Sequence, residues 1–333
     1  MRVLISGATG FVGRTIARHL LDAGHEVRAM SRSTGNAMTL FAKSEAGRRG
    51  LADGALTFVQ ADVTKPRTLL EAIAEVDVVI QTAQFSGAPV EDPKRGLTYM
   101  KVDRDGTMNL LEAIAGVYGR PPAGGRLDVP AAGLPRFLYQ SGITTSANSP
   151  YTWDRAKWQA EEAVRESGCD WTIVRCCWAF GRNDTALNRI IGYSDYLPFV
   201  PVFGNGQAPL TPVFGEDIGR LYALLVDNPD RARNTTYGLG GPDLVTLDQF
   251  LHLALRAMSR ARPILHIPKP LGKVQGAIMY RFPGRMLSPA AVDFVAAAGA
   301  VTDEDRGLLA ERFPEFRATP VREGLESYLT RST

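Results

Sequence analysis

The chain of 333 residues carries 38 basic and 35 acidic side chains, and this net charge of +3 excludes the strongly basic surface typical of nucleic-acid binding. Hydrophobic residues make up 45% of the sequence, the composition of a globular protein with a large core. Three cysteines, two of them adjacent, form no disulfide framework and indicate a reducing compartment. Without a secretory signal or an apolar stretch of about 20 residues, the sequence predicts a cytoplasmic protein with no transmembrane segment.

The first half of the chain predicts alternating strands and helices. Strands are expected over 3–6, 26–30, 56–60, 77–82, 137–140 and 171–175, and helices over 14–23, 65–74, 103–118 and 155–167. The strand over 77–82 is apolar almost throughout, as a strand buried on both faces should be. This alternation is typical of an α/β fold, a Rossmann-type doubly wound parallel sheet with helices on both faces.

Composition shifts mark the expected domain organisation. Residues 116–135 are rich in proline, glycine and alanine where a short connection would suffice, which predicts a surface insertion loop. After residue 180, prolines and glycines punctuate short strands, with helices expected over 216–227, 247–258 and the C-terminal segment. We therefore predict a large domain over 1–180 and a smaller substrate or lid lobe over 181–333, interleaved with the first.

The glycine motif at the start of the chain is its most informative feature. The first strand ends in Gly7, Gly10 and Gly13, and a helical pattern follows at once. Glycines permit a tight turn and a close backbone approach, while a helix N-terminus offers free N–H groups and a positive dipole end to a phosphate. A plain strand–turn–helix packing junction is the alternative. The place of the motif, at the head of an alternating pattern, favours a dinucleotide site.

Two arginines bear on which dinucleotide binds. An NAD site usually has an acidic residue about 20 positions beyond the glycine motif. Here Arg32 lies 19 residues after Gly13, no acid occupies the end of the second strand, and Arg14 directly follows the motif. Because two guanidinium groups suit a 2′-phosphate, NADP(H) is favoured over NAD(H). The alternative is that both arginines are solvated surface charges.

Further segments extend this pattern. Asp62 and Val63 follow the third strand, Thr82 and Ala83 end the fourth, and Asp103 opens the next helix. With the glycine motif, these segments resemble the short-chain dehydrogenase/reductase superfamily in its extended and atypical branches. There the chain is most similar to the group that includes the NADPH-binding accessory subunit of respiratory complex I and bacterial epimerase/dehydratase-like relatives.

The resemblance, with the charge argument for Arg14 and Arg32, implies a cofactor site. In the superfamily the glycine turn, the turn after the third strand and the end of the fourth strand line the dinucleotide. A helix lysine holds the nicotinamide ribose, and Cys176 stands where the sixth strand is usually followed by proline. The predicted cofactor-contacting residues are Gly7, Thr9, Gly10, Phe11, Val12, Gly13, Arg14, Arg32, Asp62, Val63, Thr82, Ala83, Lys157 and Cys176.

The catalytic pattern of the superfamily is incomplete in this chain. Active members use Tyr-x-x-x-Lys, in which the tyrosine is the general acid or base. Lys157 matches the lysine, but Trp153 stands four positions before it, and an indole cannot act as a phenol does. Tyr151, six positions before Lys157, falls on another helix face and serves only if a loop brings it in. Ser141 and Thr144 either polarise a carbonyl or are hydroxyls satisfied by the backbone.

Two functional hypotheses therefore stay open. The first is an NADP(H)-dependent oxidoreductase or epimerase-like enzyme for a small hydrophobic carbonyl or hydroxyl compound, with Tyr151, Lys157, Ser141 and Thr144 as candidate catalytic residues. The second is a non-catalytic NADPH-binding assembly, sensor or regulatory protein. Leu210, at a position where nucleotide-sugar enzymes often carry arginine, argues against a nucleotide sugar.

The remaining expectations concern metals and surfaces. The four histidines show no metal-ligand spacing, so no metal site is expected. The stretch 269–285 is either a basic amphipathic surface for a membrane or a partner, or a lid helix over the pocket. The sequence leaves a homodimer open, because the insertion over 116–135 adjoins the helix pair through which extended members dimerise.

Overall fold

The computed structural model describes residues 1–86, 90–119, 133–281, 288–296 and 299–330. Its centre is a parallel sheet of seven strands in the order β11-β6-β5-β4-β1-β2-β3. The strands are β1 (Arg2–Ser6), β2 (Glu26–Ser31), β3 (Leu56–Gln60), β4 (Val78–Gln81), β5 (Arg136–Gly142), β6 (Trp171–Cys176) and β11 (Thr235–Leu239). The predicted doubly wound Rossmann-type sheet is confirmed.

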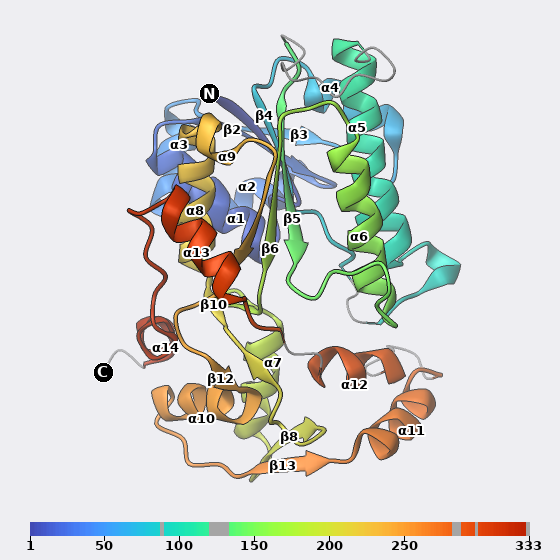
Figure 1. The fold of residues 1–333 in the computed structure, drawn as a ribbon, viewed down its shortest axis with the longest axis vertical. Helices are drawn as coiled ribbons and strands as arrows, with labels where there is room; N and C mark the ends of the chain where they lie inside the picture. The colour runs from blue at the N-terminus through green and yellow to red at the C-terminus, as the bar shows by residue number, and fades with distance from the viewer. Residues whose placement is uncertain (87–89, 120–132, 282–287, 297–298, 331–333) are drawn as a thin grey trace.

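Helices cover both faces of this sheet, because its strands are apolar on both sides. Val3 and Ile5 of β1 belong to the core beneath α1 (Phe11–Asp22) and α8 (Gly215–Asp227). Leu4, which points to the opposite face, belongs to the second core, with side chains of α4, α5 and α6. Figure 1 shows α1 and α8 on one side of the sheet and α5 and α6 on the other. The remaining helices of this part are α2 (Thr34–Phe41), α3 (Glu45–Ala52), α4 (Leu69–Ile73), α5 (Asp105–Tyr118), α6 (Thr152–Arg165), α9 (Pro229–Ala232) and α13 (Asp303–Arg312).

Several boundaries differ from those predicted. Helix α1 begins at Phe11, three residues earlier than expected, because Gly13 packs inside its first turns. The helix expected over 65–74 is a 3₁₀ turn at Pro66–Thr68 followed by the short α4. Helices α2 and α3 and strand β11 were not predicted, and most of the insertion expected over 116–135 lies outside the described residues.

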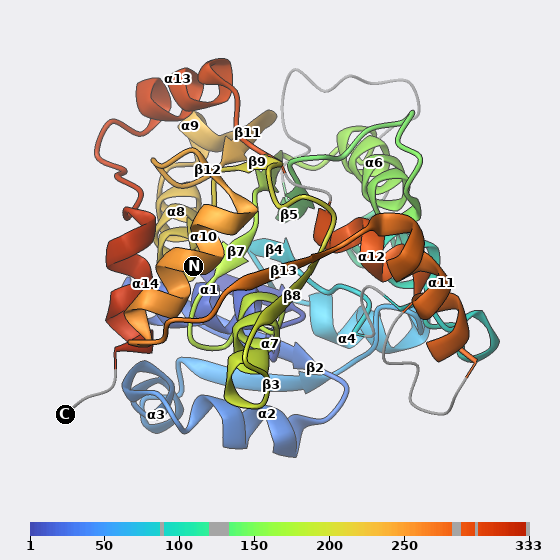
Figure 2. The ribbon, with the colours of Figure 1, turned by 90° about the horizontal axis from the view of Figure 1, so that it is seen from below.

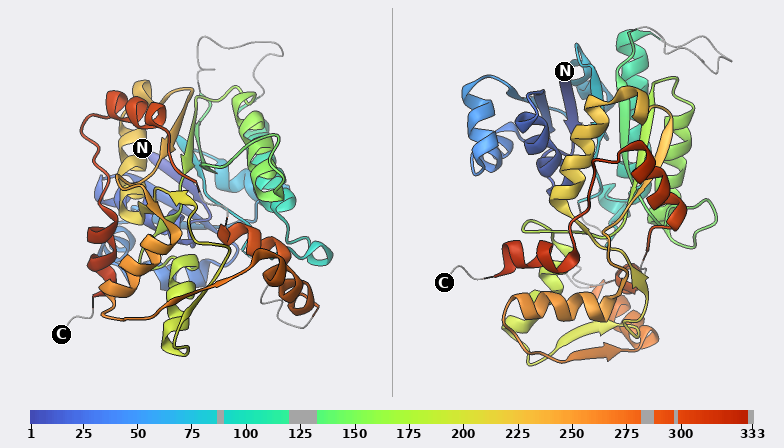
Figure 3. Two further views of the ribbon diagram at one scale, coloured as in Figure 1. Left: turned by 60° about the horizontal axis from the view of Figure 1, so that its bottom comes forward. Right: turned by 60° about the vertical axis from the view of Figure 1, so that its left-hand side comes forward.

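The small lobe lies at the end of the sheet where the strands terminate, as Figure 2 shows from below and Figure 3 from the side. Its core includes Leu187, Val200 and Phe250. A capping box, in which Thr246 and Gln249 bond each other's backbone, starts α10. The lobe is built from β7 (Ala179–Phe180), α7 (Ala186–Gly192), β8 (Val200–Phe203), β9 (Pro209–Leu210), β10 (Val213–Phe214), β12 (Val245–Thr246), α10 (Leu247–Ala257), β13 (Ile264–Ile267), α11 (Lys269–Met279), α12 (Pro289–Ala296) and α14 (Val321–Leu329).

Candidate functional site

The candidate site lies at the carboxyl ends of β1 and β4. These strands are neighbours in the sheet, and the chain runs from β1 toward one sheet edge and from β4 toward the other. Such a reversal of strand order opens a crevice in which doubly wound proteins bind their ligands. The glycine turn follows β1 directly, so the topology brings the predicted motif to this crevice.

Gly7 and Gly13 are required by packing. Gly7 has φ +71°, and a Cβ there would lie 2.7 Å from the Cα of Ala83 at the end of β4. A Cβ on Gly13 would overlap the carbonyl oxygen of Gly7. The turn is therefore pressed against both β4 and the first turns of α1, with no room for larger residues.

Gly10 is different, because the protein itself leaves room beside it. A Cβ on Gly10 would meet only the Gly7 carbonyl oxygen, at 3.2 Å. Gly10 is the N-cap of α1, where no side chain bonds the free N–H groups and the first turn holds no acid. Packing does not explain this glycine, whereas the approach of a pyrophosphate to the helix N-terminus does. The cradle fits a dinucleotide.

The other predicted residues of the turn and the neighbouring strand ends contribute mainly backbone. The Phe11 ring packs against Gly215, where a Cβ would lie 2.6 Å from it. Thr82 donates its hydroxyl to the Ser6 carbonyl at 2.7 Å. Thr9 lies in the turn itself, and the side chain of Val12 packs against the core.

The turn after β3 is held by its own side chains. Asp62 accepts hydrogen bonds from the backbone N–H and the hydroxyl of Thr64, at 2.9 and 2.8 Å. Val63 is buried, and a Cβ on Gly106 of α5 would lie 2.7 Å from it. This turn is therefore a fixed wall beside the ends of β2 and β3.

Arg14 and Arg32 form no ion pair among the residues described. Arg14 lies in the first turn of α1, where its Nε is 3.4 Å from the Gly10 carbonyl. Burial and the nearby Arg18 lower the pKa of Arg14. Arg32 is exposed and directly follows β2. Both positive charges are thus uncompensated near the crevice.

Lys157 of α6 is held by a buried acid. Its Nζ lies 3.4 Å from Oδ1 of Asp103, and the two side chains are 15% and 1% exposed. The other oxygen of Asp103 accepts a hydrogen bond from the Phe85 N–H at 3.1 Å. Burial raises the pKa of Asp103, and the Lys157 ammonium opposes that rise. The contact with Asp103 therefore fixes the position of the Lys157 ammonium.

Trp153 fills the helical position at which the superfamily places its tyrosine. Its indole is 7% exposed and stacks on the ring of Tyr151, with centroids 4.4 Å apart and planes 7° from parallel. Phe294 of α12 meets the indole edge-on at 5.2 Å, and Tyr99 lies 6.2 Å away. Tyr151 is the N-cap of α6, at the start of the helix.

The two candidate catalytic hydroxyls, those of Ser141 and Thr144, already donate hydrogen bonds to carboxylates. Ser141 donates to Glu161 at 2.6 Å, and Thr144 donates to Asp154 at 2.7 Å. The alternative held that both hydroxyls are satisfied by the backbone. Both are indeed hydrogen-bonded within the protein, but their acceptors are the carboxylates of Glu161 and Asp154 rather than backbone carbonyls. Asp154 also accepts from Ser149, while burial raises its pKa. The role of Asp154 was missed, because its partners come from the loop before α6.

Cys176 ends β6, opposite Gly142 of β5 in the sheet register. Burial raises the pKa of its thiol well above the usual value, so the sulfur is protonated at neutral pH. The neighbouring Cys177 lies 3.1 Å from the hydroxyl of Thr211. All three cysteines are free thiols.

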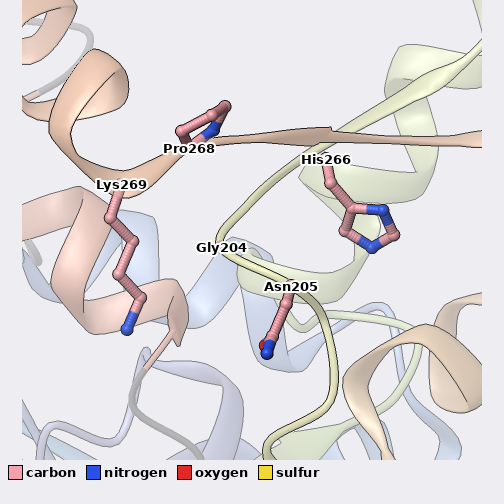
Figure 4. A pocket seen from close by; sticks show the side chains of 5 residues that line it. All are labelled: Gly204, Asn205, His266, Pro268 and Lys269. Atoms are coloured by element: carbon pink, nitrogen blue, oxygen red, sulfur yellow. The ribbon is translucent and has the colours of Figure 1, made fainter.

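The part of the chain that the structure describes includes two hollows. One, of about 600 Å³, lies in the small lobe between the loop after β8 and the start of α11. Figure 4 shows the side chains of Asn205, His266 and Lys269 around it. The other, of about 280 Å³, lies beside α1 and includes Phe11 and Glu216 in its lining.

Two wider searches covered only the residues that the structure describes. In this part of the chain, no three histidine, cysteine or acidic side chains come together in a way that could hold a metal ion. Nor does this part contain a helix long and apolar enough to span a membrane.

Comparisons with curated proteins give relatives that include a subunit of a respiratory complex and an assembly factor. The mitochondrial NADH dehydrogenase (ubiquinone) 1 alpha subcomplex subunit 9 of Arabidopsis thaliana is 25% identical over 277 residues, 82% of this chain and 62% of that protein. The photosystem II assembly factor Ycf39 of Cyanophora paradoxa is 27% identical over 180 residues, 54% of this chain and 46% of that protein. The chain thus spans less than two thirds of the length of either relative.

Solved structures share the fold over nearly the whole chain. The dTDP-glucose 4,6-dehydratase of Bacillus anthracis, in complex with NAD, has a TM-score of 0.69 at 11% identity and covers 99% of this chain and 95% of its own. The UDP-glucose 4-epimerase of Thermus thermophilus, in complex with NAD, has a TM-score of 0.66 at 18% identity, with 100% of both chains covered. These low identities establish the fold alone.

A family model decides the membership of this chain. The model of the NAD dependent epimerase/dehydratase family matches residues 3–240, which include the glycine turn, the α6 lysine and the seven strands of the sheet except Arg2, the first residue of β1. The chain belongs to the NAD-dependent epimerase/dehydratase family, a group of NAD(P)-binding proteins with the short-chain dehydrogenase/reductase fold.

Proposed function

We propose that this protein binds NADP(H) as a lasting ligand and does not turn it over. The pyrophosphate would lie on the N–H groups of α1 beside Gly10, and the nicotinamide ribose on Lys157. The observation that carries the proposal is the buried indole of Trp153, stacked on Tyr151 where a proton donor would stand. Bound dinucleotide would supply hydride chemistry, but this indole has no acidic proton to complete it.

The engaged hydroxyls support the same conclusion. Ser141 and Thr144 each donate their only hydroxyl proton to a carboxylate, so neither has a proton left for a substrate carbonyl. Lys157 keeps its counter-ion Asp103, which suits ribose binding without catalysis. Two relatives named as a respiratory complex subunit and as an assembly factor are consistent with a bound dinucleotide that serves assembly.

The test is to measure binding and turnover on the same preparation. We expect NADPH to raise the melting temperature, because a ligand that binds only the folded state stabilises it. Its absorbance should then stay constant in the presence of a panel of hydrophobic aldehydes and ketones. Replacing both partners, Lys157→Met with Asp103→Asn, removes the ribose contact without leaving a buried charge. That variant should bind NADPH about 10-fold more weakly.

One observation favours a second candidate, an oxidoreductase that uses Tyr151. Among the described residues, the phenol of Tyr151 has no hydrogen-bond partner, and its ring borders the aromatic cluster of Trp153, Tyr99 and Phe294. Oxidation of NADPH that Tyr151→Phe abolishes would establish this candidate and refute the first. Tyr196→Phe, at a tyrosine that is 89% exposed, is the matched control.

The preference for NADP(H) rests on Arg14 and Arg32. We expect Arg32→Asp to weaken NADPH binding about 10- to 100-fold and to leave NADH binding unchanged or stronger, because a carboxylate repels the 2′-phosphate and accepts a ribose hydroxyl. Titration of both dinucleotides gives the affinity ratio. Arg48→Asp, at an exposed arginine of α3, controls for net charge. An unchanged ratio in Arg32→Asp would show that the arginine is a solvated surface charge.

A further inference from the structure

The outer rim of the small lobe is unusually exposed. Residues 261–281, which we call the rim segment, run through β13 and α11, and only Gly272 and Gly276 among them are buried. Figure 1 shows β13 and α11 at the end of the molecule opposite the N-terminus. The segment therefore presents almost all of its side chains outward.

Helix α11 turns its aliphatic side chains away from the protein. Leu271, Val274 and Ile278 recur at helical spacing and are 60, 59 and 53% exposed. The other side of the helix carries the two glycines, where a Cβ would lie 2.6 Å from Phe203 and 2.7 Å from the backbone of Ser288. In the described part of α11 this aliphatic stripe faces outward, which favours the surface interpretation of 269–285 over the lid helix.

This clustering is not a general property of the surface. Of the 12 large hydrophobic side chains exposed in the described parts of the chain, four belong to the rim segment. Leu265 of β13, 47% exposed, joins the three of α11. Single exposed apolar residues are ordinary, but a contiguous group of them marks an interaction surface.

The rim segment also carries charge of a single sign. It contains no aspartate or glutamate and four basic residues, Arg262, Lys269, Lys273 and Arg281. Lys273 pairs with Asp293 at 2.9 Å, whereas the structure as described shows no ion pair for the other three. The acid Asp248, which also reaches the segment, is paired with His266. The surface is thus complementary to a negatively charged one.

The segment is already formed and anchored. Helix α11 packs along α12, and Tyr280 at its end donates its hydroxyl to the Glu91 carbonyl at 2.9 Å. Binding would therefore need no folding of the helix, and its ordering entropy would not oppose association.

We propose that the rim segment binds an anionic lipid bilayer surface. Leu271, Val274 and Ile278 would enter the boundary between headgroups and acyl chains, while Arg262 and Arg281 face the lipid phosphates. A second copy of this chain fits the rim segment less well. A two-fold interface would bring the basic residues of both copies together, with no acidic residue of the segment to pair with them. A protein partner is also disfavoured, since leucine and valine are under-represented among the residues that dominate protein interfaces. This inference does not depend on the proposed function.

The test is co-sedimentation of the full chain with vesicles. We expect binding to phosphatidylcholine vesicles that contain phosphatidylglycerol, weakened by salt, and none to phosphatidylcholine alone. Arg262→Gln with Arg281→Gln should weaken binding about 30-fold, from about 1 kcal/mol for each basic residue. Leu271→Gln with Val274→Gln and Ile278→Gln should weaken it at least about 10-fold.

A matched control variant distinguishes binding through the rim segment from nonspecific hydrophobic adsorption of the protein to vesicles. Met38→Gln, Leu70→Gln and Leu244→Gln together remove three aliphatic side chains that are 50, 49 and 66% exposed elsewhere, and this triple variant should bind as the wild type does. Equal binding to both kinds of vesicle, or none to either, would overturn the proposal. So would a dimer in sedimentation equilibrium that the α11 triple variant dissolves, since the occupant would then be a second copy.

Discussion

Gly10→Ala is expected to reduce dinucleotide affinity about 100-fold or more while the protein stays folded. Gly10 has φ −73° and ψ 172°, a conformation open to any residue, and its new methyl group would meet only the Gly7 oxygen at 3.2 Å. The methyl group would occupy the space of a pyrophosphate oxygen, and charge-assisted hydrogen bonds from the helix N–H groups are worth about 1.5–3 kcal/mol each. Calorimetric titration with NADPH measures the loss.

Two other glycines serve as controls for this prediction. Gly35→Ala in α2, where a Cβ would meet nothing within 4 Å, should leave binding unchanged. Gly13→Ala should lower both binding and stability, because its Cβ overlaps the backbone of Gly7. If Gly10→Ala binds NADPH like the wild type, the cradle at α1 does not hold the pyrophosphate.

Glu161→Gln is expected to lower the free energy of unfolding by about 3 kcal/mol. Glu161 is fully buried and accepts hydrogen bonds from Arg175 at 2.7 and 2.9 Å, from Arg165 at 2.8 Å and from Ser141 at 2.6 Å. The uncharged amide keeps the shape of the side chain but leaves two guanidinium groups without their shared counter-ion. Urea denaturation should show a lower midpoint at an unchanged slope.

The neighbouring acid is the natural control. Glu162 pairs with the same Arg165 at 2.6 Å, but its side chain is 47% exposed. Glu162→Gln should therefore change stability by no more than about 0.5 kcal/mol, as exposed ion pairs do. Equal losses in the two variants would mean that the Glu161 cluster adds nothing beyond a surface pair.

The sheet was predictable from sequence because its strands are short apolar runs that alternate with helical patterns. The prediction missed α2 and α3, which have only eight residues each and no sustained apolar period between β2 and β3. It also missed β11, whose sequence Thr-Thr-Tyr-Gly-Leu looks like a loop until it pairs with β6. Elements this short depend on tertiary pairing rather than on local pattern.

The candidate site was only half predictable for a similar reason. Motif spacing identified the glycine turn and Lys157, because both are defined within one strand–turn–helix unit or one helix. The contacts that decide the chemistry of the site join segments far apart in the sequence. Phe294 packs against Trp153, and Asp103 pairs with Lys157. No spacing rule in a single sequence connects such residues.

Strand β11 has a consequence for how this chain folds. It pairs with β6 across a stretch of some sixty residues, during which the chain builds β7 to β10, α7 and α8 in turn. Closing such a long loop is slow, so the sheet acquires its last strand late. Until then β6 is an open edge able to pair with another molecule. We expect a chain that ends at residue 180 to keep this edge of β6 unprotected and to aggregate.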